Sequence, residues 1–308
     1  MREKKRTEMK KKMTFADVMR FYLYPAEYQI LDFLSFADFA RMEEIQLAIG
    51  IAKTTLKQKY IPELRRLGLI EKYEGRRKQG KATKKLLEMF YITRNGAIKR
   101  ALRNAGIEGI LQAKGEQGLK EYAERFSNFL PPPNPGTEPT ANFRHRVLVG
   151  KAVAYLMRKG YHLAGNARTF ASALKGYEGK IAFIPDLYGI VSYSLSEYSY
   201  EDGGISRIEF YEVETNENDT KRIASKLKKY AKSYQNLKEF AIERLKPLYK
   251  ENLQFNLVFV VEAEKRDRWL EKYKKALLQA GYTNGKFLIP TKLVVLRKDF
   301  ENSYEEVV

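Results

Sequence analysis

Residues 208–215 read IEFYEVET, and this stretch decides the fold expected for the chain. Successive side chains of a β-strand point to opposite faces, so Ile208, Phe210, Glu212 and Glu214 share one face. Carboxylates on an otherwise apolar strand face are costly when they are buried without partners. The two glutamates therefore require partners from elsewhere in the chain.

The sequence around this strand alternates apolar runs with amphipathic segments. This order predicts an α/β (α+β overall) unit with a mixed sheet and helices on its faces. The expected strands are 181–184, 187–194, 207–214, 255–263 and one within 286–296, and the expected helices are 142–160, 218–240 and 266–281.

One further carboxylate lies close to this strand in the predicted sheet. Asp186 follows Pro185 at the start of an expected strand, and Glu212 lies on the next strand, a hairpin away. Neighbouring strands lie about 4.8 Å apart, so the two carboxylates can converge on one divalent cation. Such a pair can ligate magnesium and prepare a water molecule for attack at phosphorus.

The composition limits the kind of metal site. The chain has no cysteine and only two histidines, His145 and His162, which argues against zinc fingers and thiol catalysis. Carboxylate and backbone oxygens would hold any metal, and these ligands suit Mg2+ or Mn2+. The chain contains no P-loop motif, and we expect no organic cofactor.

The N-terminal half predicts a different module, a winged helix-turn-helix. Three expected helices are followed by two strands around a basic loop, and then by another helix. In order these are helices 25–39, 41–50 and 51–68, strand 69–73, loop 74–85, strand 86–93 and a helix within 92–104.

The basic charge of the chain is concentrated in this module. The 308 residues carry 57 Lys and Arg against 38 Asp and Glu, a net charge of +19, and residues 53–103 alone hold 16 basic and 4 acidic residues. This excess favours a polyanionic partner, with nucleic acid ahead of membrane. The alternative is a basic surface without a polyanionic ligand.

Double-stranded DNA is the partner that the module predicts. The third helix would enter the major groove, and the wing would lie near phosphates or the minor groove. The groove-facing residues would be Lys53, Thr54, Thr55, Lys57 and Gln58, and the wing residues would be Arg76, Arg77, Lys78, Lys81, Lys84 and Lys85. The alternative is a protein-interaction module whose lysines are only solvated.

The proline-rich stretch LPPPNPGTEPT, residues 130–140, divides the chain. We expect a winged-helix domain over 14–130, a linker over 131–141 and a nuclease-like domain over 142–308. The first residues, MREKKRTEMKKK, have no apolar segment behind them, and no apolar run approaches the roughly 18 residues of a membrane span. We therefore expect a cytoplasmic protein without a membrane partner.

These motifs together resemble the PD-(D/E)XK nuclease superfold, and their order is similar to that of the replication-relaxation family of plasmid and phage proteins. The resemblance covers most of the chain after the first dozen residues. It rests on the helix that begins Arg144-His145, on IPDLYGI, on FYEVETNENDTKRIASKLKKY and on FNLVFVVEA, all behind the winged helix.

The resemblance implies roles for several residues. Asp186 and Glu212 would be the metal carboxylates, and Glu214 stands where the nuclease pattern has its catalytic lysine. Lys226, which precedes the family's tyrosine region, is the preferred substitute for that lysine. Glu214 could instead be a further metal ligand. His145, Lys229 and Tyr230 would line the site.

The residues also allow a purely structural interpretation. Glu212 and Glu214 could pair with Arg222, Lys226 or Lys229 as ordinary ion pairs. Asp186 could serve a turn, and Tyr230 and Tyr234 could pack in the core.

Three functions follow from these alternatives. The first is a DNA-binding protein of a mobile element that nicks or cleaves DNA with Mg2+, with replication or mobile-element proteins as partners; two-fold DNA sites would suit a homodimer. The second is a non-catalytic regulator or adaptor with an inactive nuclease-like fold, and the third, less favoured, is a transposon end-cleaving subunit. A lysine close to the carboxylates supports catalysis, whereas an ion pair that seals Glu212 from solvent supports the adaptor.

Overall fold

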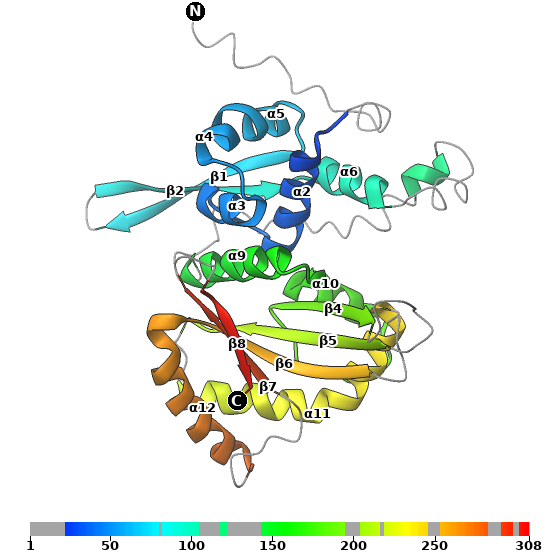
Figure 1. Cartoon of the computed structure of the whole chain (residues 1–308), viewed down its shortest axis with the longest axis vertical. Coiled ribbons are helices and arrows are strands. Elements are labelled where there is room, and N and C mark those ends of the chain that lie inside the picture. Colours follow the sequence, from blue (N-terminus) through cyan, green and yellow to red (C-terminus); the bar gives the residue numbers. More distant parts are fainter. Residues whose placement is uncertain are drawn as a thin grey trace, which may run out of the picture.

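The protein is a mixed α+β chain whose helices and strands form an N-terminal module and a separate six-stranded sheet (Figure 1). The computed structural model describes residues 22–79, 82–104, 117–121, 143–194, 204–215, 219–245, 253–282, 291–297 and 302–307. The proline-rich stretch 131–141 lies outside the described residues.

The N-terminal module has the predicted order of three helical segments, a hairpin and a further helix. Its elements are α2 (Pro25–Ala37), α3 (Met42–Ile49), a run of α4 (Lys53–Thr55), the π-helical turn η1 (Leu56–Tyr60) and α5 (Ile61–Arg66), then β1 (Ile70–Gln79), β2 (Ala82–Ile92) and α6 (Arg94–Asn104). Pro25 begins α2, and Gly50 ends α3 in the left-handed conformation with φ of 75°.

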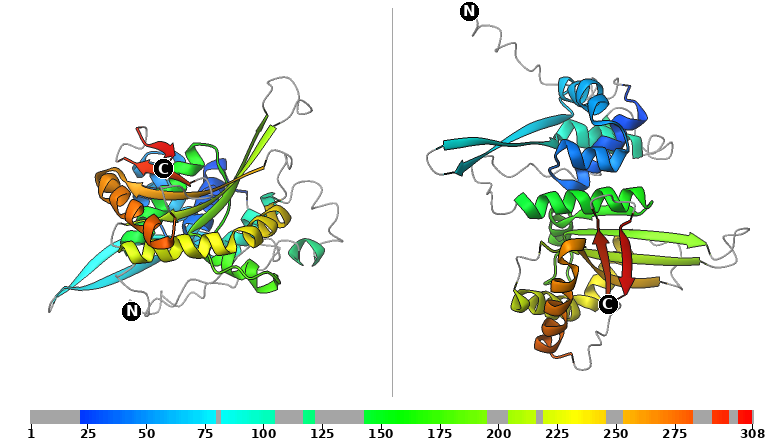
Figure 2. Two further views of the ribbon diagram at one scale, coloured as in Figure 1. Left: turned by 90° about the horizontal axis from the view of Figure 1, so that it is seen from below. Right: turned by 60° about the vertical axis from the view of Figure 1, so that its left-hand side comes forward.

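The hairpin corrects one expectation. Residues 74–85 are predicted as a loop, but β1 and β2 extend through most of this stretch, with Arg76 opposite Lys85 and Arg77 opposite Lys84. The antiparallel ladder pairs the backbone groups of both strands, and this pairing does not depend on apolar side chains. The hairpin projects from the module (Figure 2).

The C-terminal part is built on one mixed sheet with the order β3-β4-β5-β6-β7-β8. Its central pairs β5–β6 and β6–β7 are parallel, and the outer pairs are antiparallel. The strands are β3 (His162–Asn166), β4 (Leu187–Ser194), β5 (Gly204–Val213), β6 (Leu253–Glu262), β7 (Thr291–Leu296) and β8 (Tyr304–Val307). This arrangement confirms the predicted mixed sheet flanked by helices.

The edges of the sheet differ from the prediction. Residues 181–184 are not a strand, because the Ala182 N–H donates to the Ser233 hydroxyl of the next long helix, at 2.9 Å, instead of to a neighbouring strand. The edge strands β3 and β8 and the helix α10 (Ala167–Ala173) were not predicted. The expected strand within 286–296 is β7, which begins at Thr291.

Helices cover both faces of the sheet. One face packs against α11 (Thr220–Leu245) and α12 (Arg266–Ala280), which meet Phe210 of β5 and Phe259 of β6. The other face packs against α9 (Phe143–Arg158) through residues such as Tyr211 and Val260. In Figure 1, α9 lies between the sheet and the N-terminal module.

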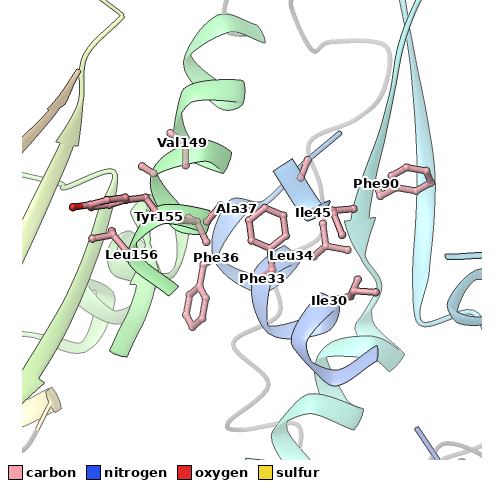
Figure 3. Close-up of a cluster of buried hydrophobic side chains, with 14 of the residues drawn as sticks. Ile30, Phe33, Leu34, Phe36, Ala37, Ile45, Phe90, Val149, Tyr155 and Leu156 are labelled. Atoms are coloured by element: carbon pink, nitrogen blue, oxygen red, sulfur yellow. The ribbon is translucent and has the colours of Figure 1, made fainter. Parts of the chain in front are cut away.

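The N-terminal module and α9 share one hydrophobic core. Figure 3 shows Phe33 and Leu34 of α2 and Ile45 of α3 on one side of this core, with Val149 and Leu156 of α9 on the other. Because the same buried cluster continues to the sheet, the two parts of the chain are packed as one body in spite of the proline-rich stretch between them.

Polar contacts reinforce this junction. The Asn166 side chain caps α10 by accepting from the backbone N–H groups of Arg168 and Thr169, at 3.2 and 3.1 Å, and its amide donates to the carbonyls of Ser35 and Phe36 at the end of α2. Asp38, which has a positive φ of 65°, accepts from the Arg168 guanidinium at 2.8 Å.

Candidate active site

Asp186 is fixed at the end of β5 by backbone contacts on three sides. Its N–H donates to the carbonyl of Tyr211 at 2.9 Å, and its own carbonyl accepts from the N–H of Ala167 at 3.0 Å. Its carboxylate Oδ2 accepts from the Val213 N–H at 2.8 Å. Asp186 is therefore held beside the strand that carries Glu212, as the hairpin argument predicts.

His145 lies on the first turn of α9 and faces Asp186. Its Nε2 is 3.2 Å from Asp186 Oδ2. Burial lowers the pKa of His145, but the hydrogen bond to Asp186 together with the negative charges of Asp186 and Glu214 outweighs burial and raises the pKa above its usual value. Burial raises the pKa of Asp186, and contacts with His145, Lys226 and Val213 outweigh this effect and hold that pKa below its usual value. The pair is thus stabilised in its charged form.

Glu212 and Glu214 both turn toward α11, as strand alternation predicts. Their exposed fractions are 3% and 0%, and Lys226 of α11 donates to both of them, with its Nζ 2.7 Å from Glu214 Oε1. The Glu214 N–H donates to the carbonyl of Val260 at 2.8 Å, which extends the β5–β6 ladder to this residue. The lysine preferred from the sequence is therefore the one that reaches the carboxylates, and the same contact forms the ion pair of the structural interpretation.

The acidic site (Asp186, Glu212 and Glu214) places three carboxyl groups close to one lysine. Burial and the nearby Asp186 carboxylate raise the pKa of Glu212 to about 8, even though Lys226 lies against it. The same carboxylates outweigh the effect of burial on Lys226 and raise its pKa above the usual value, so this lysine stays charged. At neutral pH Glu212 therefore favours its protonated form, and a cation bound at the site would displace this proton.

Carboxylate oxygens are the type of ligand that a hard divalent cation prefers. In the parts of the chain that the structure describes, no group of three or more His, Asp or Glu side chains is arranged to hold a metal ion. Mg2+, however, commonly binds through one or two carboxylates together with water and substrate phosphate oxygens. Asp186 and Glu212 supply two carboxyl groups of this type.

Two residues expected to line the site lie elsewhere. Tyr230 is fully buried in the core, where its ring packs against Phe183 and Phe210. Lys229 is exposed, and within the described residues it makes no ion pair with the carboxylates. Both follow from the rotation of α11 about its axis, which points Lys226 inward and Lys229 outward.

A second charged cluster, at the end of β6, was not predicted. Glu262 ends β6 and accepts from Lys151 of α9 and from Lys265, both at 2.9 Å. Lys265 also donates to the Thr215 carbonyl at 3.1 Å. A glutamate directly after the buried strand 255–261 was the available signal, because the carboxyl ends of parallel strands share one edge of a sheet.

The residues expected to contact DNA are exposed where the structure describes their side chains. Lys53, Thr54, Thr55, Lys57 and Gln58 all project from the α4–η1–α5 run, while Leu56, Ile61 and Leu64 pack inward. Lys53 pairs with Glu43 at the surface. Arg76, Arg77, Lys78, Lys84 and Lys85 lie on the hairpin strands, and Lys81 lies outside the described residues.

Comparisons with known proteins give little further guidance. No protein-family model matches the chain, and no curated protein matches it. Among solved structures, the restriction endonuclease FokI is similar at 11% sequence identity with a TM-score of 0.20, over 89% of this chain and 68% of that chain. A similarity at this TM-score does not establish a common fold. None of the described helices combines the length and apolar composition that crossing a bilayer requires.

Proposed function

We propose that the chain is a DNA-binding protein of a mobile element, of the replication-relaxation type, in which a winged helix-turn-helix precedes a PD-(D/E)XK-like nuclease site. The observation that carries this proposal is the convergence of Asp186, Glu212 and Lys226 at one end of β5. The exposed polar and basic residues of the α4–η1–α5 run support the DNA-binding part. Double-stranded DNA is the proposed partner, together with replication proteins of the same element, and a homodimer would suit a two-fold DNA site.

The proposed reaction is hydrolysis of a phosphodiester in DNA. Asp186 and Glu212 would hold Mg2+ or Mn2+, which supplies positive charge at the scissile phosphate. His145 and the Val213 N–H hold the Asp186 carboxylate in one orientation. The proposed role of Lys226 is to stabilise the negative charge that develops at phosphorus.

Glu214 has a different proposed role in this arrangement. It stands where the nuclease pattern has a lysine, and it accepts from Lys226 at 2.7 Å. This hydrogen bond fixes the lysine that comes from α11 instead of from the strand. We therefore propose Glu214 as a positioning residue for Lys226.

One observation favours a second candidate, a non-catalytic DNA-binding regulator or adaptor. Glu212 is 3% exposed and is paired with Lys226, so the ion pair closes this carboxylate from solvent. In this candidate function the buried charges stabilise the fold and the acidic site performs no chemistry. Asp186, with 20% of its side chain exposed, would then be the only member of the site within partial reach of solvent.

Conversion of supercoiled plasmid at low salt with Mg2+ or Mn2+ separates the two candidates. The site variant carries Asp186→Asn with Glu212→Gln, which keeps the side-chain shapes. The matched control carries Asp267→Asn with Glu271→Gln, which removes the same charge from the exposed face of α12. For a nuclease, the site variant should lose at least about a hundredfold in nicking rate while the control nicks like wild type.

The other outcomes are equally informative. If no protein nicks the plasmid while all three bind DNA equally, the second candidate is correct. If the wild-type chain binds no duplex at low salt, the DNA-binding part of the proposal is wrong. Circular dichroism of each variant shows whether the fold is retained.

A further inference from the structure

The exposed face of α11 is basic without interruption over more than half of the helix. Every charged residue from Thr220 to Asn236 is Lys or Arg, and the first acidic residue is Glu239. Lys226 points inward to the acidic site. Five other basic residues of this stretch are exposed and form the basic face of α11: Lys221, Arg222, Lys228, Lys229 and Lys232.

Helical geometry places this face directly beside the acidic site. Residues three and four apart in a helix are neighbours on its surface. Arg222 precedes Lys226 by four residues and Lys229 follows it by three, so these two cations flank the lysine that contacts Glu212 and Glu214. The opposite side of α11, which includes Leu227 and Leu237, is buried against the sheet.

In the described residues, the Asp219 carboxylate just before α11 accepts from the backbone N–H of Arg222 at 2.8 Å. Within the described part of the chain, none of the five cations of the basic face makes an ion pair with a carboxylate, whereas the exposed Lys53 and Arg66 pair with Glu43 and Glu63. Like charges at neighbouring helix positions repel one another, so a polyanion that lay along this face would relieve the repulsion.

The neighbouring helix provides an internal comparison. The exposed charges of α12 are of mixed sign and comprise Asp267, Arg268, Glu271, Lys274 and Lys275. An unmixed positive face is therefore not a general property of the surface helices in this chain. Within the basic face the intervening exposed residue is Ser225, so the face lacks the large apolar side chains that an interfacial membrane helix inserts.

The position of the face suits a nucleic-acid duplex. Lys221 to Lys232 spans about 16 Å of helix, which is roughly five phosphate steps of B-DNA. Figure 1 and the left view of Figure 2 show the N-terminal end of α11 on the side of the molecule to which the β1–β2 hairpin projects.

We infer that the basic face of α11 binds the phosphate backbone of double-stranded DNA and holds the duplex across the acidic site. This inference rests on the proposed function and adds to it a second DNA-contacting surface, remote from the N-terminal module. Its contacts are with phosphates, so it contributes affinity and position without base specificity.

Salt-dependent binding of a 5′-fluorescein-labelled duplex of about 30 base pairs tests this inference. The α11 variant carries Arg222→Gln, Lys229→Gln and Lys232→Gln. The matched control carries Arg268→Gln, Lys274→Gln and Lys275→Gln, which removes the same charge from α12. Loss of three phosphate contacts should reduce the slope of log K against log salt by about 2 to 3 and weaken binding more than about tenfold at 0.1 M salt, with the control slope unchanged.

A second measurement uses the absence of cysteine from the chain. Lys229→Cys and Lys275→Cys each provide one attachment point for a photoactivatable cross-linker. The inference predicts cross-linking to the duplex from position 229 and little from position 275.

The outcomes separate this inference from the proposed function. Equal slopes for the α11 variant and its control, with equal cross-linking from both positions, overturn the inference and leave DNA binding by wild type intact. Failure of the wild-type chain to bind the duplex overturns both. If the wild-type chain binds phosphatidylserine vesicles and no duplex, the face recognises a membrane surface, and the inference is wrong.

Discussion

At the scale of single residues, Lys226 supplies the positive charge that pairs with Glu212 and Glu214 of the acidic site. It is the counter-ion of two carboxylates that are almost fully buried, and it reaches them from a different element of the fold. Removal of one partner from such a buried group leaves charge without compensation, which costs more than the pair contributes.

We expect Lys226→Met to lower the free energy of unfolding by about 3 kcal/mol, because Glu212 and Glu214 then lose their counter-ion. Lys229→Met, one turn along the same helix but exposed, should change it by less than about 0.5 kcal/mol. Adding Glu214→Gln to Lys226→Met should recover part of the loss. Urea denaturation of the three variants measures this, and equal effects of the two methionine substitutions would refute the account.

Glu262 predicts a pH dependence that is separate from the acidic site. Burial raises its pKa, but hydrogen bonds from Lys265 and Lys151 outweigh burial and hold the pKa below the usual 4.5. The unfolded state then binds the proton more tightly, so this contribution is present above about pH 4.5 and is lost as the pH falls through the folded-state pKa.

Glu262→Gln should therefore flatten the loss of stability between pH 5 and pH 3 and should cost up to about 1 kcal/mol at pH 7. The exposed Glu271→Gln on α12 is the control and should leave the wild-type slope unchanged. Urea denaturation at each pH provides the curves. Identical slopes for wild type and Glu262→Gln would show that these ion pairs do not contribute.

The junction of α10 with α2 is the feature that matters at the scale of elements. One side chain, Asn166, satisfies two N–H groups at the start of α10 and two carbonyls at the end of α2. Free N–H and C=O groups at helix ends are otherwise unpaired, so a single amide stabilises two helix termini from different parts of the chain.

Asn166→Ala should lower the free energy of unfolding by about 1 to 2 kcal/mol, the usual cost of a lost helix cap. Asn166→Asp keeps the capping oxygen but replaces the donating amide with a carboxylate that faces two carbonyls, so it should not restore wild-type stability. Thermal unfolding of both variants measures this. Full recovery by the aspartate would show that only the cap of α10 matters.

The shared core determines how the whole molecule unfolds. Phe33 of α2 is fully buried in the cluster that α9 carries to the sheet. The one tryptophan, Trp269, lies on the other side of the sheet, stacked on Tyr273 of α12. Its fluorescence therefore reports on the C-terminal part alone.

Phe33→Ala should shift the unfolding transition of Trp269 fluorescence, with a loss of about 3 to 5 kcal/mol, because a cavity in a common core destabilises both parts together. Circular dichroism should show the same single transition. A tryptophan transition that stays at the wild-type midpoint would mean that the N-terminal module unfolds independently. Gln235→Ala, on the exposed face of α11, is the control.

The sequence by itself determined the elements that have strong periodicity. Alternation in 207–214 placed Glu212 and Glu214 on one face, and the hairpin with 187–194 placed Asp186 beside them. These results follow from local backbone geometry, because side chains alternate between the two faces of a strand and recur about every 3.6 residues on one face of a helix. The helices of the N-terminal module were predictable for the same reason.

Only the tertiary structure decided which groups meet across elements. Residues 181–184 have a strand-like pattern, yet the Ala182 N–H donates to Ser233 of α11, which is 51 residues away. The short segment 162–166 is a strand because it pairs with the edge of β4. Lys226 and Lys229 are three residues apart, and the packing of Leu227 and Tyr230 sets the rotation of α11 that turns one toward the carboxylates and the other to solvent. A sequence carries the period of a helix but not its angle against the sheet, which the whole core determines.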